Sequence, residues 1–131
     1  MRLLLDTHVV LWALTRSTKL SRAGWDLLED EQNPLVVSAV SIWEIAIKHA
    51  RGQGRANSVP MSGTSALSVV RAADFDLLEI TLGHAAAVDD LASHHRDPFD
   101  RLLVAQARSE SMHLLTHDVQ LAAYGDFVIV V

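Results

Sequence analysis

The stretch RLLLDTHVVLWAL, residues 2–14, places a short apolar run directly before an acidic residue and a second apolar segment. The leucines within residues 2–6 are consecutive, which is typical of a strand buried on both faces of a sheet. Residues 7–14 space their apolar side chains as an amphipathic helix does. The stretch therefore predicts a buried strand that ends at Asp6 and leads straight into a helix.

The same alternation of strand and helix continues along the chain. Further short apolar runs that predict strands lie at 35–39, 75–80, 113–117 and 126–131. Helical patterns lie at 22–31, 41–50, 62–73, 82–92 and 98–110, with a short helix after residue 118. Short apolar strands that alternate with helices indicate an α/β fold with a parallel sheet covered on both faces. We therefore expect a three-layer sandwich.

The length and composition fit a single globular domain spanning residues 1–131. Half of the residues are apolar and 21% are charged, as in ordinary soluble proteins. The absence of cysteine excludes disulfides and zinc–thiolate sites. Asp6 and His8 interrupt the N-terminal apolar run, no small-residue cleavage site follows, and no apolar run reaches the length of a membrane span. We expect a cytoplasmic protein without membrane contact.

The formal net charge of −5 ordinarily argues against a nucleic-acid partner. That argument weakens if several carboxylates share one site where a divalent cation neutralises them. Lys19 and Lys48 are the only lysines, so arginine carries most of the positive charge. Arginine suits bidentate contacts with phosphate.

Acidic residues stand at or near the start of several predicted helices. They are Asp6, Glu44, Asp97, Asp100 and Asp118. Helix capping explains each aspartate separately, since its carboxylate can accept hydrogen bonds from the first turn. Glu44 could form a capping box with Ser41 or an ion pair with Lys48. Its neighbours are apolar, however, so Glu44 is expected to be buried and to need a strong partner.

Three of these helices directly follow a predicted parallel strand. Their starts lie on the edge of the sheet where open α/β folds bind ligands. Capping gives no reason for so many acidic residues at one edge without a basic partner among them, and their repulsion favours a bound cation. Oxygen ligands without cysteine or clustered histidine favour Mg²⁺, with Mn²⁺ as a substitute, over Zn²⁺. The sequence thus predicts a metal-binding acidic cluster.

The other candidate residue types are assigned to the surface, to supporting contacts or to the core. The seven histidines lack H-E-x-x-H spacing and are expected at the surface or beside the ligands. Trp12, Trp25 and Trp43 lie among apolar neighbours and are expected in the core. No phosphate-binding lysine loop and no G-x-S-x-G turn is present. An acidic metal cluster without a protein nucleophile suits phosphodiester hydrolysis by a metal-activated water.

Four blocks of the sequence together resemble PIN domains, in particular the VapC-type toxins of toxin–antitoxin pairs. The blocks are LLLDTHVVLW (3–12), SAVSIWEIAIK (38–48), HRDPFDRLLVAQA (95–107) and LLTHD (114–118). The resemblance spans nearly the whole chain. It implies a central five-stranded parallel sheet, Mg²⁺-dependent ribonuclease activity on RNA, and a cognate VapB-type antitoxin that inhibits the site. A homodimer is also expected.

The four acidic residues of the family are matched by position by Asp6, Glu44, Asp100 and Asp118. Asp6 and Asp100 are expected to contact the ion most directly, and Glu44 and Asp118 at short range or through water. Asp97 belongs to a D-P-F-D variant and is expected mainly as the N-cap, with a role as a fifth acid left open. The polar residues expected beside the acidic ones are Thr7, Ser38, Ser41 and Thr116.

The segment after the Glu44 helix departs from the family pattern. Relatives often read G-K-L-x-L-P there, whereas this chain reads GQGRANSVP at 52–60. Arg51 and Arg55 replace the expected basic residue. They are expected either to capture RNA phosphates or to lie in a solvated loop at the end of the helix.

Two other classes of protein are alternatives. A phospho-accepting receiver domain also has an acidic Mg²⁺ pocket, but it needs an acidic pair after the first strand and a lysine after a late strand. Here Thr7 follows Asp6, and no lysine follows Lys48. An inactive PIN domain that serves only as a binding module should lack at least one of the four acidic residues, and none is missing.

Overall fold

The computed structural model describes residues 1–52 and 59–131 of the chain. Its sheet has five parallel strands in the spatial order β3-β2-β1-β4-β5. The strands are β1 (Leu3–Leu5), β2 (Leu35–Ser38), β3 (Asp76–Leu78), β4 (His113–Thr116) and β5 (Val128–Val130). The predicted parallel sheet is confirmed, and each strand lies within its predicted range.

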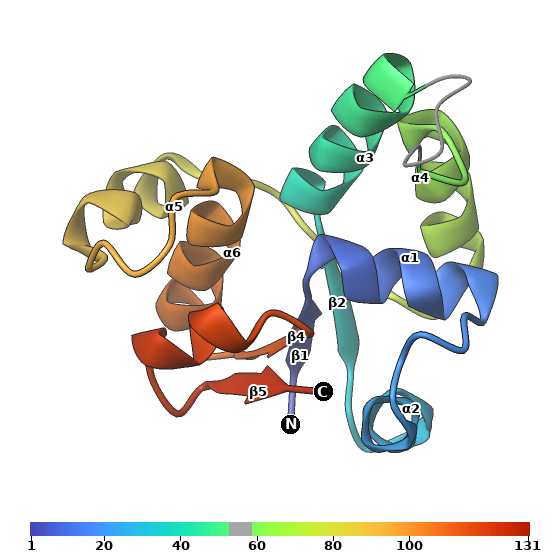
Figure 1. Cartoon of the computed structure of the whole chain (residues 1–131), viewed down its shortest axis with the longest axis horizontal. Helices are drawn as coiled ribbons and strands as arrows, with labels where there is room; N and C mark the ends of the chain where they lie inside the picture. The colour runs from blue at the N-terminus through green and yellow to red at the C-terminus, as the bar shows by residue number, and fades with distance from the viewer. Residues whose placement is uncertain (53–58) are drawn as a thin grey trace.

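Helices cover both faces of this sheet, which confirms the expected three-layer sandwich (Figure 1). The α-helices are α1 (Thr7–Thr15), α2 (Arg22–Glu29), α3 (Ala39–Gly52), α4 (Gly63–Ala72), α5 (Leu82–Ala87) and α6 (Pro98–Ser109). Two 3₁₀ segments are η1 (Val88–Asp90) and η2 (Val119–Tyr124). Within the described ranges, no helix has both the length and the apolar character needed to cross a bilayer.

Successive residues of β1 contribute to two separate cores, one on each face of the sheet. Leu4 packs in the core that includes Leu103 of α6. Leu3 and Leu5 pack in the core that includes Val10 of α1, together with residues of α3 and α4. A strand that is buried on both faces must be apolar at every position. The run of three leucines therefore determines that β1 lies in the centre of the sheet.

The strand order reverses beside β1. Strands β2 and β3 lie on one side of β1, whereas β4 and β5 lie on the other. Such a topological switch point opens a crevice at the carboxyl ends of the two diverging strands, and ligands bind there in open α/β folds. In this protein the switch point lies between the ends of β1 and β4, where the N–H of Asp6 donates to the carbonyl of Leu115 (3.0 Å).

Helix α3 begins earlier than its sequence pattern predicts. It starts at Ala39, directly after β2, and the Ser38 side chain accepts a hydrogen bond from the N–H of Val40 (3.0 Å). Ser41 therefore lies inside the helix. The capping box considered for Ser41 and Glu44 is wrong, because the first turn is already capped by Ser38.

The tryptophans lie nearer the surface than expected. Trp12 and Trp25 are only partly buried, and Trp43 is 53% exposed. The expectation that Trp43 belongs to the core is wrong, because it lies on a side of α3 that lines an open groove. Its ring packs edge-on against Phe99, with 4.9 Å between the ring centroids.

The predicted helix at 82–92 ends early, at Ala87. The N–H of Leu91 donates to the carbonyl of Val88 (3.2 Å), and the Arg101 guanidinium donates to the same carbonyl (3.4 Å). These contacts close a tighter turn in place of the next helical turn. Leu91 enters the core as a result.

Substitution of Gly63, at the start of α4, tests the close packing of α4 on α3. A Cβ at this position would lie 2.8 Å from the Cβ of Ala46 and 3.2 Å from the carbonyl oxygen of Ile42. We expect Gly63→Ala to lower the free energy of unfolding by about 1–3 kcal/mol, because α3 and α4 must separate. Urea unfolding measures this change.

Gly83→Ala in α5 is the matched control, since only Thr81 Oγ1 lies near its Cβ position, at 3.7 Å. This variant should be neutral or more stable by up to about 1 kcal/mol. Equal effects of the two substitutions would contradict the close approach of α4 to α3.

Candidate metal centre

Asp6 lies at the switch point, between β1 and α1. Its Oδ1 accepts a hydrogen bond from the N–H of Val9 (2.9 Å), and its Oδ2 accepts one from the hydroxyl of Thr116. Asp6 is therefore both the predicted N-cap of α1 and a link between the ends of β1 and β4. Burial raises the pKa of Asp6, although these hydrogen bonds act to lower it. A nearby cation would offset this cost of burial.

Asp97 and Asp100 stand at the start of α6. Oδ1 of Asp97 accepts hydrogen bonds from the N–H groups of Phe99 (2.8 Å) and Asp100 (3.3 Å), which confirms Asp97 as the N-cap. Burial raises the pKa of Asp100 to about 7, with further contributions from the negative charges of Asp97, Asp6 and Glu44. The fold therefore brings these four carboxyl groups close enough to repel one another.

Glu44 approaches the cluster from α3 and is only 2% exposed. Its Oε1 accepts a hydrogen bond from the Thr7 hydroxyl (2.5 Å), and Ser41 Oγ lies 3.1 Å from the same hydroxyl. Its Oε2 pairs with Lys48 Nζ at 2.5 Å. The ion pair with Lys48 that the sequence offered for Glu44 is therefore confirmed, and the absence of a basic partner does not hold for this residue. Lys48, one helical turn further on, is the strong partner that burial of this carboxylate requires.

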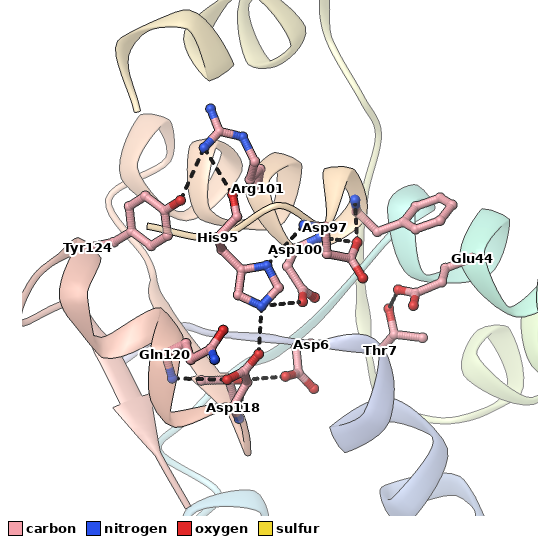
Figure 2. Close-up of polar contacts among 12 residues, drawn as sticks. Asp6, Thr7, Glu44, His95, Asp97, Asp100, Arg101, Asp118, Gln120 and Tyr124 are labelled. Carbon is pink, nitrogen blue, oxygen red and sulfur yellow. Dashed lines mark hydrogen bonds and ion pairs between the residues drawn. The ribbon is translucent and has the colours of Figure 1, made fainter. Parts of the chain in front are cut away.

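Asp118 reaches the same edge from the segment after β4 (Figure 2). Its Oδ1 accepts a hydrogen bond from the N–H of Gln120 (2.9 Å), which confirms it as a cap, and its Oδ2 lies 2.8 Å from Nε2 of His95. The same ring nitrogen lies 3.6 Å from Oδ2 of Asp100. One potential ligand atom from each of His95, Asp100 and Asp118 lies within 4.8 Å of the other two.

The remaining predicted residues do not all face the acidic cluster. The Ser38 hydroxyl donates to Oε1 of Gln106 in α6 (2.5 Å), so it supports the contact between β2 and α6. Arg51 is exposed in the last turn of α3. Arg55 lies among residues 53–58, outside the described residues. Capture of RNA by the two arginines stays a prediction.

Two residues at this edge were not singled out by the sequence, His95 and Arg101. The Arg101 guanidinium donates to the carbonyls of Ala92 (3.1 Å) and His95 (3.4 Å) and to the hydroxyl of Tyr124 (3.2 Å). His95 is one of seven histidines, and nothing in its own sequence pattern marks it. The one signal that could have identified both residues is their position beside the D-P-F-D segment.

The carboxylate oxygens at this edge of the sheet are suitable ligands for a hard divalent cation. Figure 2 shows the carboxyl groups of Asp6, Asp100 and Asp118 turned toward a common space. Asp100 accepts no hydrogen bond from the described residues, and its Oδ2 lies 3.6 Å from Nε2 of His95, which leaves its Oδ1 free to bind an ion. Mg²⁺ and Mn²⁺ prefer such carboxylate oxygens. The residues present therefore fit the expected ion.

Known proteins share this fold over nearly the whole chain. A model of the PIN domain matches residues 3–126. The VapBC2 complex from Rickettsia felis, bound to a DNA fragment from its promoter, is 14% identical, with a TM-score of 0.69 over 100% of this chain and 98% of that chain. A toxin–antitoxin complex from Klebsiella pneumoniae is 15% identical, with a TM-score of 0.66 over 97% of this chain and 95% of that chain.

A third solved structure is VapC20 from Mycobacterium tuberculosis, described as a toxin that cleaves the sarcin–ricin loop. It is 14% identical, with a TM-score of 0.62 over 94% of this chain and 95% of that chain. No curated protein sequence matches the chain. At these identities the solved structures establish a common fold.

The raised pKa of Asp100 makes the stability of the metal-free protein depend on pH. Between the ordinary value of 3.8 and about 7, the folded chain holds the proton more tightly than the unfolded chain, so a rise in pH favours unfolding. Asp100→Asn removes this titration. We expect the melting temperature of Asp100→Asn, minus that of the wild type, to increase from pH 5 to about pH 7 and then level off.

Thermal unfolding in EDTA measures this difference. Asp126→Asn is the matched control, because Asp126 is exposed, and its difference from the wild type should not follow this pH profile. Parallel profiles for Asp100→Asn and the wild type would contradict the raised pKa of Asp100.

Proposed function

Since the chain belongs to the PIN domain family, we propose that it is a metal-dependent endoribonuclease and the toxin of a toxin–antitoxin pair. The observation that carries this proposal is the group of carboxylates, partly or fully buried, at the switch point between β1 and β4. The proposed role as a toxin is supported by two solved structures with this fold, which are toxin–antitoxin complexes. The substrate is proposed to be RNA.

The acidic residues take different roles in this proposal. Asp6 and Asp100 hold the ion directly, while Glu44 and Asp118 act at short range or through water. Asp97 is the N-cap of α6 and keeps its charge close to Asp100. The ion is Mg²⁺, with Mn²⁺ as a substitute. When bound, it supplies the positive charge that activates water for attack on a phosphodiester and stabilises the leaving oxygen.

Hydrogen bonds within the protein hold most of these carboxylates in place in the absence of an ion. Thr116 orients Asp6, and Lys48 orients Glu44. Ligands that are already oriented lose little side-chain freedom when an ion binds. Asp100 has a pKa of about 7, so its ionisation is coupled to the arrival of a cation.

The topology separates this proposal from a receiver domain. Receiver domains have the doubly wound strand order 2-1-3-4-5. The order here is β3-β2-β1-β4-β5, with β1 in the centre of the sheet. The retention of Asp6, Glu44, Asp100 and Asp118 argues against an inactive binding module.

RNA cleavage by the purified chain tests the proposed activity. We expect single-stranded RNA to be cleaved in Mg²⁺ and left intact in excess EDTA. Asp6→Asn and Asp100→Asn should each reduce the cleavage rate to about 1% of wild type or less, because each removes a charged ligand. The exposed Asp126→Asn is the control and should cleave normally. Full cleavage in EDTA would refute the metal-dependent nuclease.

The proposed antitoxin has a candidate docking surface on the outer side of α3. A groove of about 430 Å³ lies between α3, α4 and β3. Its apolar lining includes Ile42, Trp43, Ala46, Leu67 and Leu77. Trp43 is 53% exposed and Leu77 49%, so the chain alone leaves large apolar side chains in water. We propose that an apolar helix of the antitoxin fills this groove, and that its polar or basic tail reaches the acidic cluster.

Coexpression with the small protein encoded directly upstream tests this surface. Trp43→Ala should weaken binding of that protein about tenfold or more, because buried aromatic anchors dominate interfaces of this kind. Val130→Ala, on the opposite edge of the sheet, should bind normally. Equal affinities of the two variants in titration calorimetry would exclude the groove as the docking surface. A homodimer stays a prediction.

A further inference from the structure

His95 has a place at the edge of the acidic cluster but no role in the function proposed above. Its side chain is 13% exposed, and its two ring nitrogens have different partners. Nδ1 accepts a hydrogen bond from the N–H of Asp97 (3.1 Å), while Nε2 lies 2.8 Å from Oδ2 of Asp118. The spacing of His95, Asp100 and Asp118 is compatible with three ligands of one ion. The question is whether the ring binds the ion or supports a ligand.

The contact at Nδ1 decides which ring nitrogen carries the hydrogen. A backbone N–H can only donate, so Nδ1 must offer its lone pair to Asp97, and the neutral ring carries its hydrogen on Nε2. Nε2 therefore donates to Asp118. An ion would need the lone pair of Nε2, which requires the hydrogen to move to Nδ1. There it would point at the N–H of Asp97, and the hydrogen bond would be lost.

We propose that His95 is a positioning residue, which donates from Nε2 to the Asp118 carboxylate and is not itself a metal ligand. The proposal rests on the proposed function, since it takes the carboxylates as the metal site. Asp118 is more exposed than Asp6, Glu44 and Asp100, with 35% of its side chain accessible, and it is the N-cap of the short 3₁₀ segment η2. A second hydrogen bond, on Oδ2, limits rotation of its carboxylate. Supporting hydrogen bonds of this kind orient metal-ligating carboxylates.

The backbone around His95 is held by Arg101. Its guanidinium donates to the carbonyl of His95 itself and to the hydroxyl of Tyr124 (Figure 2). It also donates to the carbonyl of Ala92. These contacts join the segment before α6 to the helix and to η2. They occupy the Arg101 guanidinium with protein oxygens. The position of the His95 ring is therefore fixed through its carbonyl on one side and through the Asp97 amide on the other.

Two substitutions separate the two contacts of the His95 ring. In His95→Gln, the amide nitrogen can take the place of Nε2 and donate to Asp118. In His95→Asn, the side-chain carbonyl oxygen can take the place of Nδ1 and accept from the N–H of Asp97. The side chain is too short, however, to reach Asp118. The adjacent His94→Gln is the control, because His94 is exposed and packs against Tyr124.

Mn²⁺ binding to the purified proteins without RNA, measured by electron paramagnetic resonance titration, gives the readout. We expect His95→Asn to raise the dissociation constant about 10–100-fold and His95→Gln to stay within about threefold of wild type. The ¹⁵N shifts of the metal-free protein should report the Nε2–H tautomer of His95. The Mn²⁺ spectrum should show no ¹⁴N coupling from a bound imidazole.

Three results would overturn the proposal in different ways. A ¹⁴N coupling that disappears in His95→Asn would make His95 a ligand. Unchanged Mn²⁺ affinity in His95→Asn would make the ring dispensable while the metal site survives. Failure of the wild type to bind Mn²⁺ would remove the metal site itself, and the proposed function would fail together with the role of His95.

Discussion

Repulsion among carboxylates at one edge of the sheet is the constraint on which the rest of this site depends. Three of these carboxylates have a partner that offsets part of the cost of their burial. The pairs are Asp6 with Thr116, Glu44 with Lys48, and Asp118 with His95. Asp100 has no such hydrogen bond from the described residues, and burial raises its pKa to about 7, with further contributions from the charges of Asp97, Asp6 and Glu44. The protein thus keeps one carboxyl group ready to release a proton when a cation arrives.

Capping and ion binding are compatible roles for the same side chains. Asp6, Asp97 and Asp118 each use Oδ1 to accept N–H groups at the start of the following helix. In Asp6 and Asp118, Oδ2 contacts a partner on another segment. The positive end of each helix dipole also favours a carboxylate at this place. A parallel α/β sheet therefore sets several oriented carboxylates at one edge, because its helices start where its strands end.

The sequence predicts those features that depend on neighbouring residues. It does not predict features that depend on contacts between segments far apart in the chain. The three leucines of β1 and the caps at Asp6, Asp97 and Asp118 are of the first kind, because they depend on a few neighbouring residues. The end of α5 at Ala87 is of the second kind, since the Arg101 guanidinium ends it from another helix. The exposure of Trp43 and the contact of His95 with Asp118 likewise depend on packing between elements. Burial of Glu44 was predictable from its apolar neighbours and its pair with Lys48 from their i,i+4 spacing, because both depend on one helix.

The bond between Thr116 and Asp6 joins residues 110 positions apart in the sequence. Strand β1 emerges from the ribosome before its neighbour β4, and β4 and the Asp118 that follows it are made only after more than a hundred further residues. A growing chain that stops before β4 therefore contains Asp6, Glu44, Asp97 and Asp100 but has no switch point to gather them. For a proposed toxin, this order of synthesis means that growing chains carry no assembled site, and the hazard to the cell begins only after β4 and Asp118 have been made.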